Sequence, residues 1–461
     1  MATSPAAPRT PGGAPVDRLE SALAAEVARF EQTHPRAAAR HAAGESALLG
    51  GVPMPWMMLW PGGFPIIATR AKGARLWDVD GHEYVDLCLG DTGAMTGHAP
   101  DPVVAAAGDR IAQGTTLMLP TEDADVVGGE LARRFGLPHW QITLSATDAN
   151  RNAIRMARHA TGRDKVLCFA YSYHGGVDET FAVTAPDGST VARENNVGPP
   201  VDVALTTRAV EFNDIDAVRA ALAHGDVACV IAEPAMTNMG IILPEPGFHE
   251  QLRALTREAG TLLVIDETHT FSAGPRGATA IYRLEPDILT IGKAIAGGVP
   301  AGALGLSDEL ARRLLDDPTA DLEDTGGIGG TLAGNALSLA AMRAALTEVL
   351  TDEAFARAIA VCDRLRAGVE EVIAEHGLPW HAIQLGSRVE YRFTPTPPRN
   401  GTASHLGGDP LLERFMHLHA LNRGVLVTPF HNMLLASPAT TDADADLHTR
   451  VFGEAVRELF G

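Results

Sequence analysis

The sequence is poor in cysteine and has no long apolar run. Its 461 residues include four cysteines, which are widely spaced and form no CxxC pair. We therefore expect buried, reduced thiols in a cytoplasmic protein, with neither a disulfide framework nor a metal site. No uninterrupted apolar stretch reaches the ~18 residues of a membrane-spanning helix, so no transmembrane segment is expected.

Basic residues are scarce relative to acidic ones. The chain has 37 lysines and arginines against 57 aspartates and glutamates, a formal net charge of −20 at pH 7. Such a field repels nucleic acid and anionic membranes, which leaves small molecules as the expected ligands. The low aromatic content of 5% does not exclude an aromatic substrate, because Trp56, Trp60 and Phe64 lie in a segment that can line a pocket.

The N-terminal region has two parts. Residues 1–16 are rich in Ala, Pro, Gly, Ser and Thr and lack the charged start and apolar run of a signal peptide. We expect them to form a disordered tail. Apolar residues then recur at helical spacing, which predicts an amphipathic helix over residues 16–34.

The middle of the chain alternates between helical and strand patterns, which predicts an α/β fold. Such alternation gives a mostly parallel sheet with helices on both faces and a ligand site at the carboxyl ends of the strands. The expected helices are 102–112, 122–135, 149–161, 215–223 and 247–259, and the expected strands are 141–144, 165–169, 229–232, 261–265 and 288–291.

Four segments make up the expected domain organisation. They are a tail and helix (1–45), the N-terminal part of a small domain (46–105), a large cofactor-binding domain (106–335) and a C-terminal α+β small domain (336–461). Asp80-Gly81 predicts a turn between two strands within residues 75–89. The Pro- and Gly-rich stretch 395–408 is expected to be a mobile loop.

Polar residues follow three predicted strands directly. Glu233, Asp266 and Lys293 each come where an apolar run ends. The nearly apolar surroundings of Lys293 favour the neutral amine that attacks an aldehyde. Asp266 is costly to bury without a cationic partner, and a protonated pyridine nitrogen is such a partner.

Two further stretches suit a phosphate and a planar ring. Ser145, Ala146 and Thr147 follow a strand and open a helix, where backbone amides bind anions. The glycine-rich turn 326–330 places Thr331 before another helix and offers a second contact to phosphate. Tyr173-His174 follows a strand, and an aromatic ring there can stack on a cofactor.

Together these residues resemble the class III (fold type I) pyridoxal-5'-phosphate (PLP) aminotransferases, in the branch that includes glutamate-semialdehyde aminomutase. The resemblance covers residues 63–461 and implies a large domain with a mostly parallel seven-stranded sheet plus a smaller α+β domain. The motifs that carry it are 76–86, 97–98, 145–149, 173–175, 233–234 with 238–240, 266–267, 286–287 with 292–293, and 330–331 with 334–335.

The resemblance assigns a role to each of these residues. It implies that Lys293 forms the internal aldimine with PLP and then shuttles the substrate proton, while Asp266 keeps the pyridine nitrogen protonated. Tyr173 and Thr268 are expected on the two ring faces, with His174, Glu233 and His269 nearby. Thr147 and its neighbouring amides bind phosphate, as does Thr331 of the partner subunit, which implies a homodimer with shared active sites.

The chain departs from the family in two stretches. Many relatives read Asp-Glu-Val where this chain reads Asp266-Glu267-Thr268, and His269 then places an unusual polar group near the ring. Both a hydrogen-bonded supporting role and a catalytic role remain open for it. Aminomutases carry a glutamate at the position that aligns with Asn432, which weakens the aminomutase interpretation.

Arginines are the candidate ligands for a substrate carboxylate. Arg388, Glu390 and Arg392 alternate along one predicted strand and so share a face. An arginine there can clamp a carboxylate through a bidentate pair, and a salt-linked solvated face is the alternative. Arg70 is a weaker candidate for the same task.

We therefore expect a PLP-dependent aminotransferase with a ping-pong mechanism, which passes an amino group from an amino acid to a keto acid or ketone. The alternative is a glutamate-semialdehyde-type 2,1-aminomutase that uses the same residues. A third possibility is a catalytically silent dimeric binding protein on the same fold. The joint presence of Lys293 and Asp266 argues against it, because a buried charged pair is costly to keep.

Overall fold

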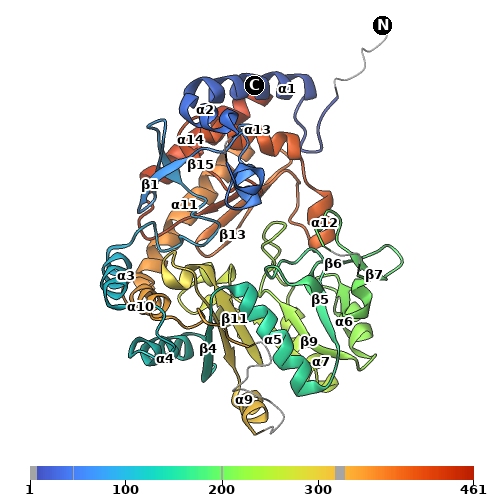
Figure 1. The fold of residues 1–461 in the computed structure, drawn as a ribbon. Coiled ribbons are helices and arrows are strands. Elements are labelled where there is room, and N and C mark those ends of the chain that lie inside the picture. Colours follow the sequence, from blue (N-terminus) through green and yellow to red (C-terminus); the bar gives the residue numbers. More distant parts are fainter. Residues whose placement is uncertain (1–7, 45, 199–200, 317–327) are drawn as a thin grey trace. The chain divides into compact units, whose positions relative to one another are not determined.

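The computed structural model describes residues 8–44, 46–198, 201–316 and 328–461, and it divides into two compact units. The first unit comprises Met1–Ala99, Ala356–Pro397 and Gly407–Gly461, and the second comprises Pro100–Phe355 and Pro398–Leu406. Figure 1 shows that the blue N-terminal and red C-terminal helices belong to the same unit. The first unit is thus built from both ends of the chain.

The second unit is organised around a seven-stranded sheet. The strand β12 pairs antiparallel with β11 and β4, and the other pairings of the sheet are parallel, so the expected mostly parallel α/β sheet is confirmed. In spatial order the strands are β4 (His139–Thr143), β12 (Gly302–Leu306), β11 (Ile288–Gly292), β10 (Leu262–Asp266), β9 (Val227–Ala232), β5 (Lys165–Phe169) and β8 (Thr207–Val210).

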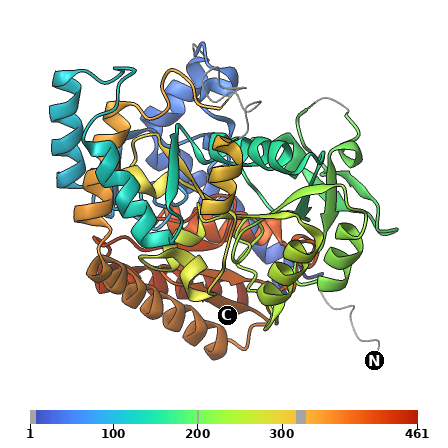
Figure 2. The ribbon, with the colours of Figure 1, turned by 90° about the horizontal axis from the view of Figure 1, so that it is seen from below.

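Both faces of this sheet are covered by helices. Alternate residues of a strand point to opposite faces. On β5, Val166 and Cys168 join one apolar cluster with α5 (Ala146–Thr161), whereas Leu167 and Phe169 join another with α6 (Ile215–Leu222) and α7 (Phe248–Ala259). Figure 2 shows these helices on either side of the strands.

The second unit contains further helices beside the sheet. The helix α10 (Ala336–Ala344) packs on α3 (Asp101–Gln113) and α4 (Asp123–Phe135). The expected large domain, 106–335, ended before α10, and those domain bounds stay a prediction. Further elements of this unit include α8 (Gly277–Ile281), α9 (Asp308–Leu315), α12 (Gly401–Leu406), β6 (Ala182–Thr184), β7 (Thr190–Ala192), and the short helical turns η5 (Thr270–Ala273) and η6 (Lys293–Ala296).

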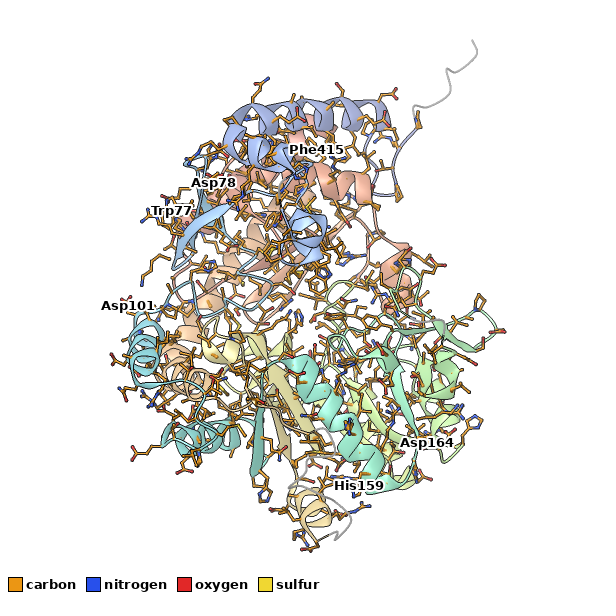
Figure 3. The ribbon with its side chains drawn as sticks, viewed as in Figure 1. Trp77, Asp78, Asp101, His159, Asp164 and Phe415 are labelled. Carbon is orange, nitrogen blue, oxygen red and sulfur yellow. The ribbon has the colours of Figure 1, made fainter. Side chains whose placement is uncertain are left out.

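Helices and two small sheets form the first unit. Its apolar core includes Phe415, which is fully buried on α13 (Figure 3). Its sheets have the orders β1-β2-β3-β15 and β13-β14-β16. Its elements include α1 (Val16–Thr33), α2 (Pro35–Ala43), most of α11 (Asp352–Glu375), α13 (Pro410–Leu421), α14 (Asp442–Phe460), β1 (Ala68–Lys72), β2 (Arg75–Asp78), β3 (Glu83–Asp86), β13 (His381–Leu385), β14 (Arg388–Arg392), β15 (Val425–Leu426) and β16 (Met433–Leu435).

Two expectations about irregular segments were wrong. The tail was expected to be disordered through residue 16, but Gly12 accepts a hydrogen bond from Trp380 Nε1 (2.8 Å) and donates one to Asp409 (2.9 Å). Residues 1–7 of that tail lie outside the described part. The stretch expected as a mobile loop contains α12, whose Ser404 hydroxyl donates to the Met239 carbonyl. Both segments are held by partners distant in sequence.

Other expectations were confirmed. The four cysteines are buried and free. The turn at Asp80-Gly81 joins β2, which carries Trp77 and Asp78 (Figure 3), to β3. Among the helices of the described ranges, none is both long and apolar enough to cross a membrane.

The close contact between Gly302 of β12 and the end of β4 leaves no room for a side chain. A Cβ atom on Gly302 lies 2.3 Å from the Ser145 carbonyl oxygen and 2.6 Å from Thr143 Oγ1. Gly302→Ala is therefore expected to lower the free energy of unfolding by about 1–3 kcal/mol. Gly108→Ala, in the exposed interior of α3 with no heavy atom within 4 Å, is the control and gains up to ~1 kcal/mol. Urea unfolding measures both, and unchanged stability of Gly302→Ala contradicts this packing.

Candidate active site

Three polar side chains lie at the carboxyl edge of the parallel strands in the second unit. Asp266 is the last residue of β10, Glu233 follows β9, and Lys293 follows β11. Asp266 pairs in register with Thr290 of β11, one strand over. The sheet therefore gathers the three residues that the sequence predicted at strand ends.

The Asp266 carboxylate is the most elaborately bound of these groups. It is 3% exposed, and it accepts hydrogen bonds from His174 Nδ1 (2.9 Å), Asn150 Nδ2 (2.8 Å) and the Thr268 amide (3.0 Å). Burial alone raises its pKa, but the hydrogen bond and charge of His174, together with Thr268, outweigh burial and lower the pKa to about 2. Asp266 is consequently an anion near neutral pH.

Sequence reasoning missed two residues that complete this network. Asn150 donates to the His174 carbonyl (3.0 Å) as well as to Asp266, and it accepts from Thr290 Oγ1 (2.5 Å). Both side chains are fully buried. The one available signal was the spacing on α5, because Asn150 lies three residues after Thr147 and so on the same side of the helix.

Lys293 is held in an unusual backbone conformation. Its φ of 51° is in the left-handed region, which residues other than glycine rarely adopt and which clusters at functional sites. Its Nζ lies 2.7 Å from His269 Nε2. The structure thus brings together the predicted Schiff-base lysine and the histidine at which the chain departs from the family.

The start of α5 has the form of an anion site. The Ser145 side chain caps the helix by accepting from the Asp148 amide (3.2 Å), and Thr147 Oγ1 accepts from the Gly176 amide (3.2 Å). A Cβ atom on Gly175 would lie 2.0 Å from Thr147 Oγ1, so only glycine permits this approach. The first amides of an α-helix lack partners within the helix and favour a bound anion. Ala146 and Thr147 supply such amides.

Glu233 is a buried acid beside this network. It accepts hydrogen bonds from the Thr237 amide (3.2 Å) and hydroxyl (2.5 Å). Burial, with a smaller contribution from the charge of Asp266, raises its pKa to about 7. Glu233 therefore takes up and releases a proton near neutral pH, unlike Asp266.

Two other predicted cofactor contacts lie in less enclosed places. Tyr173 is half-buried and meets Phe181 edge to face, with ring centroids 6.2 Å apart. Thr331 is exposed. Gly326 and Gly327 of the predicted glycine-rich turn lie outside the described residues.

The first unit contains the residues predicted to bind substrate. Arg388 is fully buried on β14 and donates to Thr92 Oγ1 (2.6 Å), whereas Arg392 is 8% exposed with Nη1 4.0 Å from Glu390 Oε1. The predicted alternation on one strand is confirmed, but the strand is buried throughout and is not a solvated face. Arg388 is thus occupied within the core.

Arg70 and Asn432 are also engaged in this unit. The Arg70 guanidinium carbon lies 3.9 Å from the centroid of the Trp77 ring, a cation–π contact on an exposed strand. Asn432 Oδ1 lies 2.9 Å from His417 Nε2, and burial lowers the pKa of His417 to about 4. Asn432 therefore pairs with a neutral imidazole inside the protein.

The residues of the second unit fit PLP. A buried carboxylate that is ionised near neutral pH suits a protonated pyridine nitrogen, and a lysine amine suits the aldehyde. The α5 N-terminus suits the phosphate. The protonated ring nitrogen of PLP thus accounts for a buried, ionised carboxylate at this edge of the sheet.

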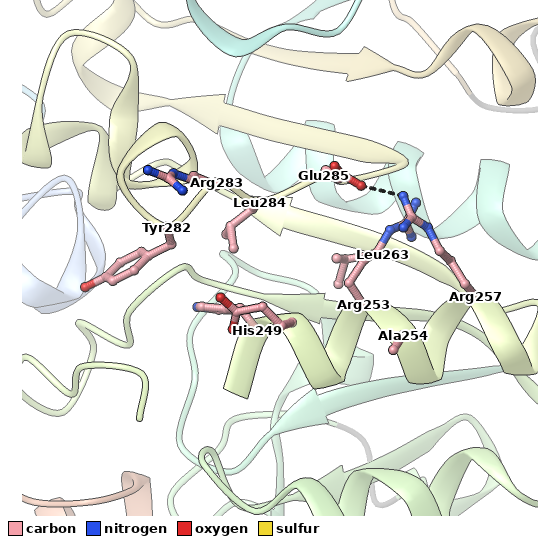
Figure 4. A pocket seen from close by; sticks show the side chains of 10 residues that line it. His249, Arg253, Ala254, Arg257, Leu263, Tyr282, Arg283, Leu284 and Glu285 are labelled. Carbon is pink, nitrogen blue, oxygen red and sulfur yellow. Dashed lines mark hydrogen bonds and ion pairs between the residues drawn. The ribbon is translucent and has the colours of Figure 1, made fainter. Parts of the chain in front are cut away.

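A pocket elsewhere in this unit lacks such chemistry. Figure 4 shows it between α7 and the segment after α8, beside Leu263 near the amino end of β10 and thus at the opposite end of the strand from Asp266. Its Arg253 binds Asp287 (2.7 Å) and its Arg257 binds Glu285. These arginines already have carboxylate partners.

Comparisons with known proteins agree with the geometry. Residues 60–455 match the model of the family described as aminotransferase class-III. A glutamate-1-semialdehyde 2,1-aminomutase of Bacillus cereus (strain G9842) is 32% identical over 393 residues, which cover 84% of this chain and 89% of the relative.

Solved structures are similar along nearly the whole chain. A glutamate-1-semialdehyde-aminomutase from Pseudomonas aeruginosa PAO1 has a TM-score of 0.94 and 48% identity over 97% of this chain and 99% of its own. A lysine variant of that protein was solved in complex with PMP. A β-phenylalanine aminotransferase from Variovorax paradoxus has a TM-score of 0.85 and 28% identity, covering 95% of this chain and 97% of its own.

The raised pKa of Glu233 makes the stability depend on pH. Between its ordinary pKa of 4.5 and about 7, the folded state keeps a proton that the unfolded state releases, so stability falls as pH rises through this window. The shift corresponds to about 3 kcal/mol. Glu233→Gln removes this pH dependence. The free energy of unfolding of the variant, relative to that of wild type, is therefore expected to rise by about 3 kcal/mol from about pH 5 to about pH 8. Urea unfolding of both proteins at the two pH values measures this rise. If the stability difference between variant and wild type is the same at both pH values, Glu233 is not a buried, protonated acid.

Proposed function

We propose that this chain, which belongs to the class III aminotransferase family and uses PLP, moves an amino group within one substrate as a 2,1-aminomutase does. The substrate class is a small carboxylic acid with an amine and an aldehyde on neighbouring carbons, of the glutamate-1-semialdehyde type. The amine leaves C2 and is placed on C1, while the C1 carbonyl oxygen is lost as water and a second water supplies the oxygen of the new C2 carbonyl. Substrate and product are isomers.

One observation carries this proposal. The protein from Pseudomonas aeruginosa that bears the aminomutase name matches the chain from end to end, and the similar Bacillus cereus protein has the same name. Similarity of this extent includes both the sheet that holds Asp266 and Lys293 and the first unit. It supports the aminomutase over the two-substrate aminotransferase that the sequence motifs alone favoured.

The chain's own residues have distinct tasks under this proposal. PLP supplies an aldehyde and an electron-withdrawing ring that makes the adjacent C–H bond acidic. Lys293 holds the aldehyde end and carries the proton between carbon atoms. Asp266 stays ionised opposite the ring nitrogen, since its pKa is about 2. Ser145, Ala146 and Thr147 bind the phosphate at the start of α5.

Other residues enclose the ring. Tyr173 and Thr268 are proposed on its two faces, with His174 and Glu233 behind the ring nitrogen. Thr331 of the partner subunit is proposed to contact the phosphate, which makes the enzyme a homodimer. In the first unit, Arg392 remains the better candidate for the substrate carboxylate, because Arg388 donates to Thr92 within the core.

A two-substrate aminotransferase is the second candidate, and Asn432 favours it. Aminomutases of the family carry a glutamate at this position, whereas here an uncharged amide pairs with His417. The similar fold of the Variovorax paradoxus enzyme, which is a β-phenylalanine aminotransferase, is consistent with that activity. A two-substrate enzyme uses the same lysine and aspartate and needs a separate keto acid to accept the amine.

Isomerisation without a second substrate tests the proposal. Holoenzyme and glutamate-1-semialdehyde alone are expected to give 5-amino-4-oxopentanoate in equimolar yield, detected by chromatography. Lys293→Ala is expected to lower turnover by more than about 10²-fold, because the proton then has no carrier. Lys72→Ala is the control, since this exposed lysine on β1 donates to the Ala99 carbonyl.

A different set of products would contradict the aminomutase. No product from the semialdehyde alone, but amine transfer from an α- or β-amino acid to an added keto acid, contradicts the aminomutase and supports the second candidate. Lack of both reactions in PLP-loaded protein supports a catalytically silent binding protein.

A further inference from the structure

His269 and Lys293 form a contact of the site that the family resemblance did not anticipate. Their side-chain nitrogens are 2.7 Å apart, a short hydrogen bond between an amine and an imidazole. Both side chains are half-buried, in the same unit. His269 belongs to the stretch in which this chain departs from many members of its family.

The backbone of His269 is fixed on both sides. The preceding residue donates its amide to Asp266 (3.0 Å), and the following Thr270 hydroxyl donates to Glu267 (2.6 Å). The His269 carbonyl accepts from the Ser272 amide (3.2 Å). Glu267 is fully buried and also accepts from the amides of Ala278 and Thr279. A side chain supported in this way is held in place rather than sampling solvent.

Lysine chemistry supplies the reason for such a neighbour. An ordinary lysine amine carries an extra proton at neutral pH, and that proton must leave before the nitrogen has a lone pair with which to attack a carbonyl or to remove a proton from carbon. A neutral imidazole is the side chain suited to take and return a proton near neutral pH. At 2.7 Å, the imidazole is within direct transfer distance of the amine.

We propose that His269 is the proton-exchange partner of Lys293. One proton passes from the Lys293 ammonium to His269 Nε2, which leaves a neutral amine and an imidazolium, and the same proton returns when the amine is protonated again. No electrons or other atoms are exchanged. The inference deepens the proposed function, because it rests on Lys293 as the reacting amine, but it holds equally for an aminomutase and for a two-substrate aminotransferase.

Capture of PLP by apoprotein tests this inference without any amino substrate. Stopped-flow absorbance follows the visible band that forms when PLP joins Lys293, near neutral pH. His269→Ala and His269→Gln are both expected to slow its appearance by about 10²-fold, because neither side chain accepts a proton from the amine. Added imidazole is expected to restore the rate in His269→Ala but not in wild type or His269→Gln. His159→Ala removes an exposed histidine of α5 and serves as the matched control.

The outcomes separate proton exchange from simple positioning. Normal capture by His269→Gln, with slow capture by His269→Ala, overturns the proposal, because a hydrogen bond then suffices. Wild-type rates in both variants, or no rescue of His269→Ala by imidazole, overturn it as well. Circular dichroism checks folding, and His269→Gln keeps the test valid if the alanine variant fails to fold. Because capture needs no amino substrate, a negative semialdehyde assay leaves this result unaffected.

Discussion

The buried, ionised carboxylate of Asp266 is the interaction on which the site depends. A carboxylate placed in an apolar sheet edge without partners takes up a proton. Here the hydrogen bond and charge of His174, together with Thr268, outweigh burial and hold its pKa near 2, and Asn150 donates to the same carboxylate. The protein thus presents a fixed negative charge at the carboxyl edge of the sheet, which we propose faces the ring nitrogen of PLP.

The helix α5 connects the other parts of the site to that charge. Its first turn carries Thr147, next to the Gly175 turn, and its second turn carries Asn150, which binds both Asp266 and the His174 carbonyl. The strand β11 is bound to the same helix by the hydrogen bond that Thr290 donates to Asn150. One helix therefore sets the spacing between the anion-binding amides and the buried carboxylate, while Lys293 extends from the end of β11.

Much of this arrangement could be predicted from local patterns. Asp266, Lys293 and Glu233 were found because each ends an apolar run, and runs of that kind converge at one sheet edge. The antiparallel β12 was not predicted, since its Gly302–Leu306 sequence has no β-branched residue and is positioned by pairing with β11 and β4. Asn150 and the packed residues 8–15 were also missed, because the partners that hold them are distant in sequence.

The affinity of Asp266→Asn for PLP shows whether the Asp266 carboxylate binds the cofactor. Equilibrium titration of apoprotein, followed by the visible band, compares the variant with wild type, and the only other lysines of the chain, Lys72 and Lys165, do not obscure the Lys293 signal. A charged hydrogen bond to the ring nitrogen contributes about 1.5–3 kcal/mol. We therefore expect Kd to rise by about 10- to 150-fold. An unchanged Kd contradicts this expectation and means that the Asp266 network serves the fold rather than the cofactor.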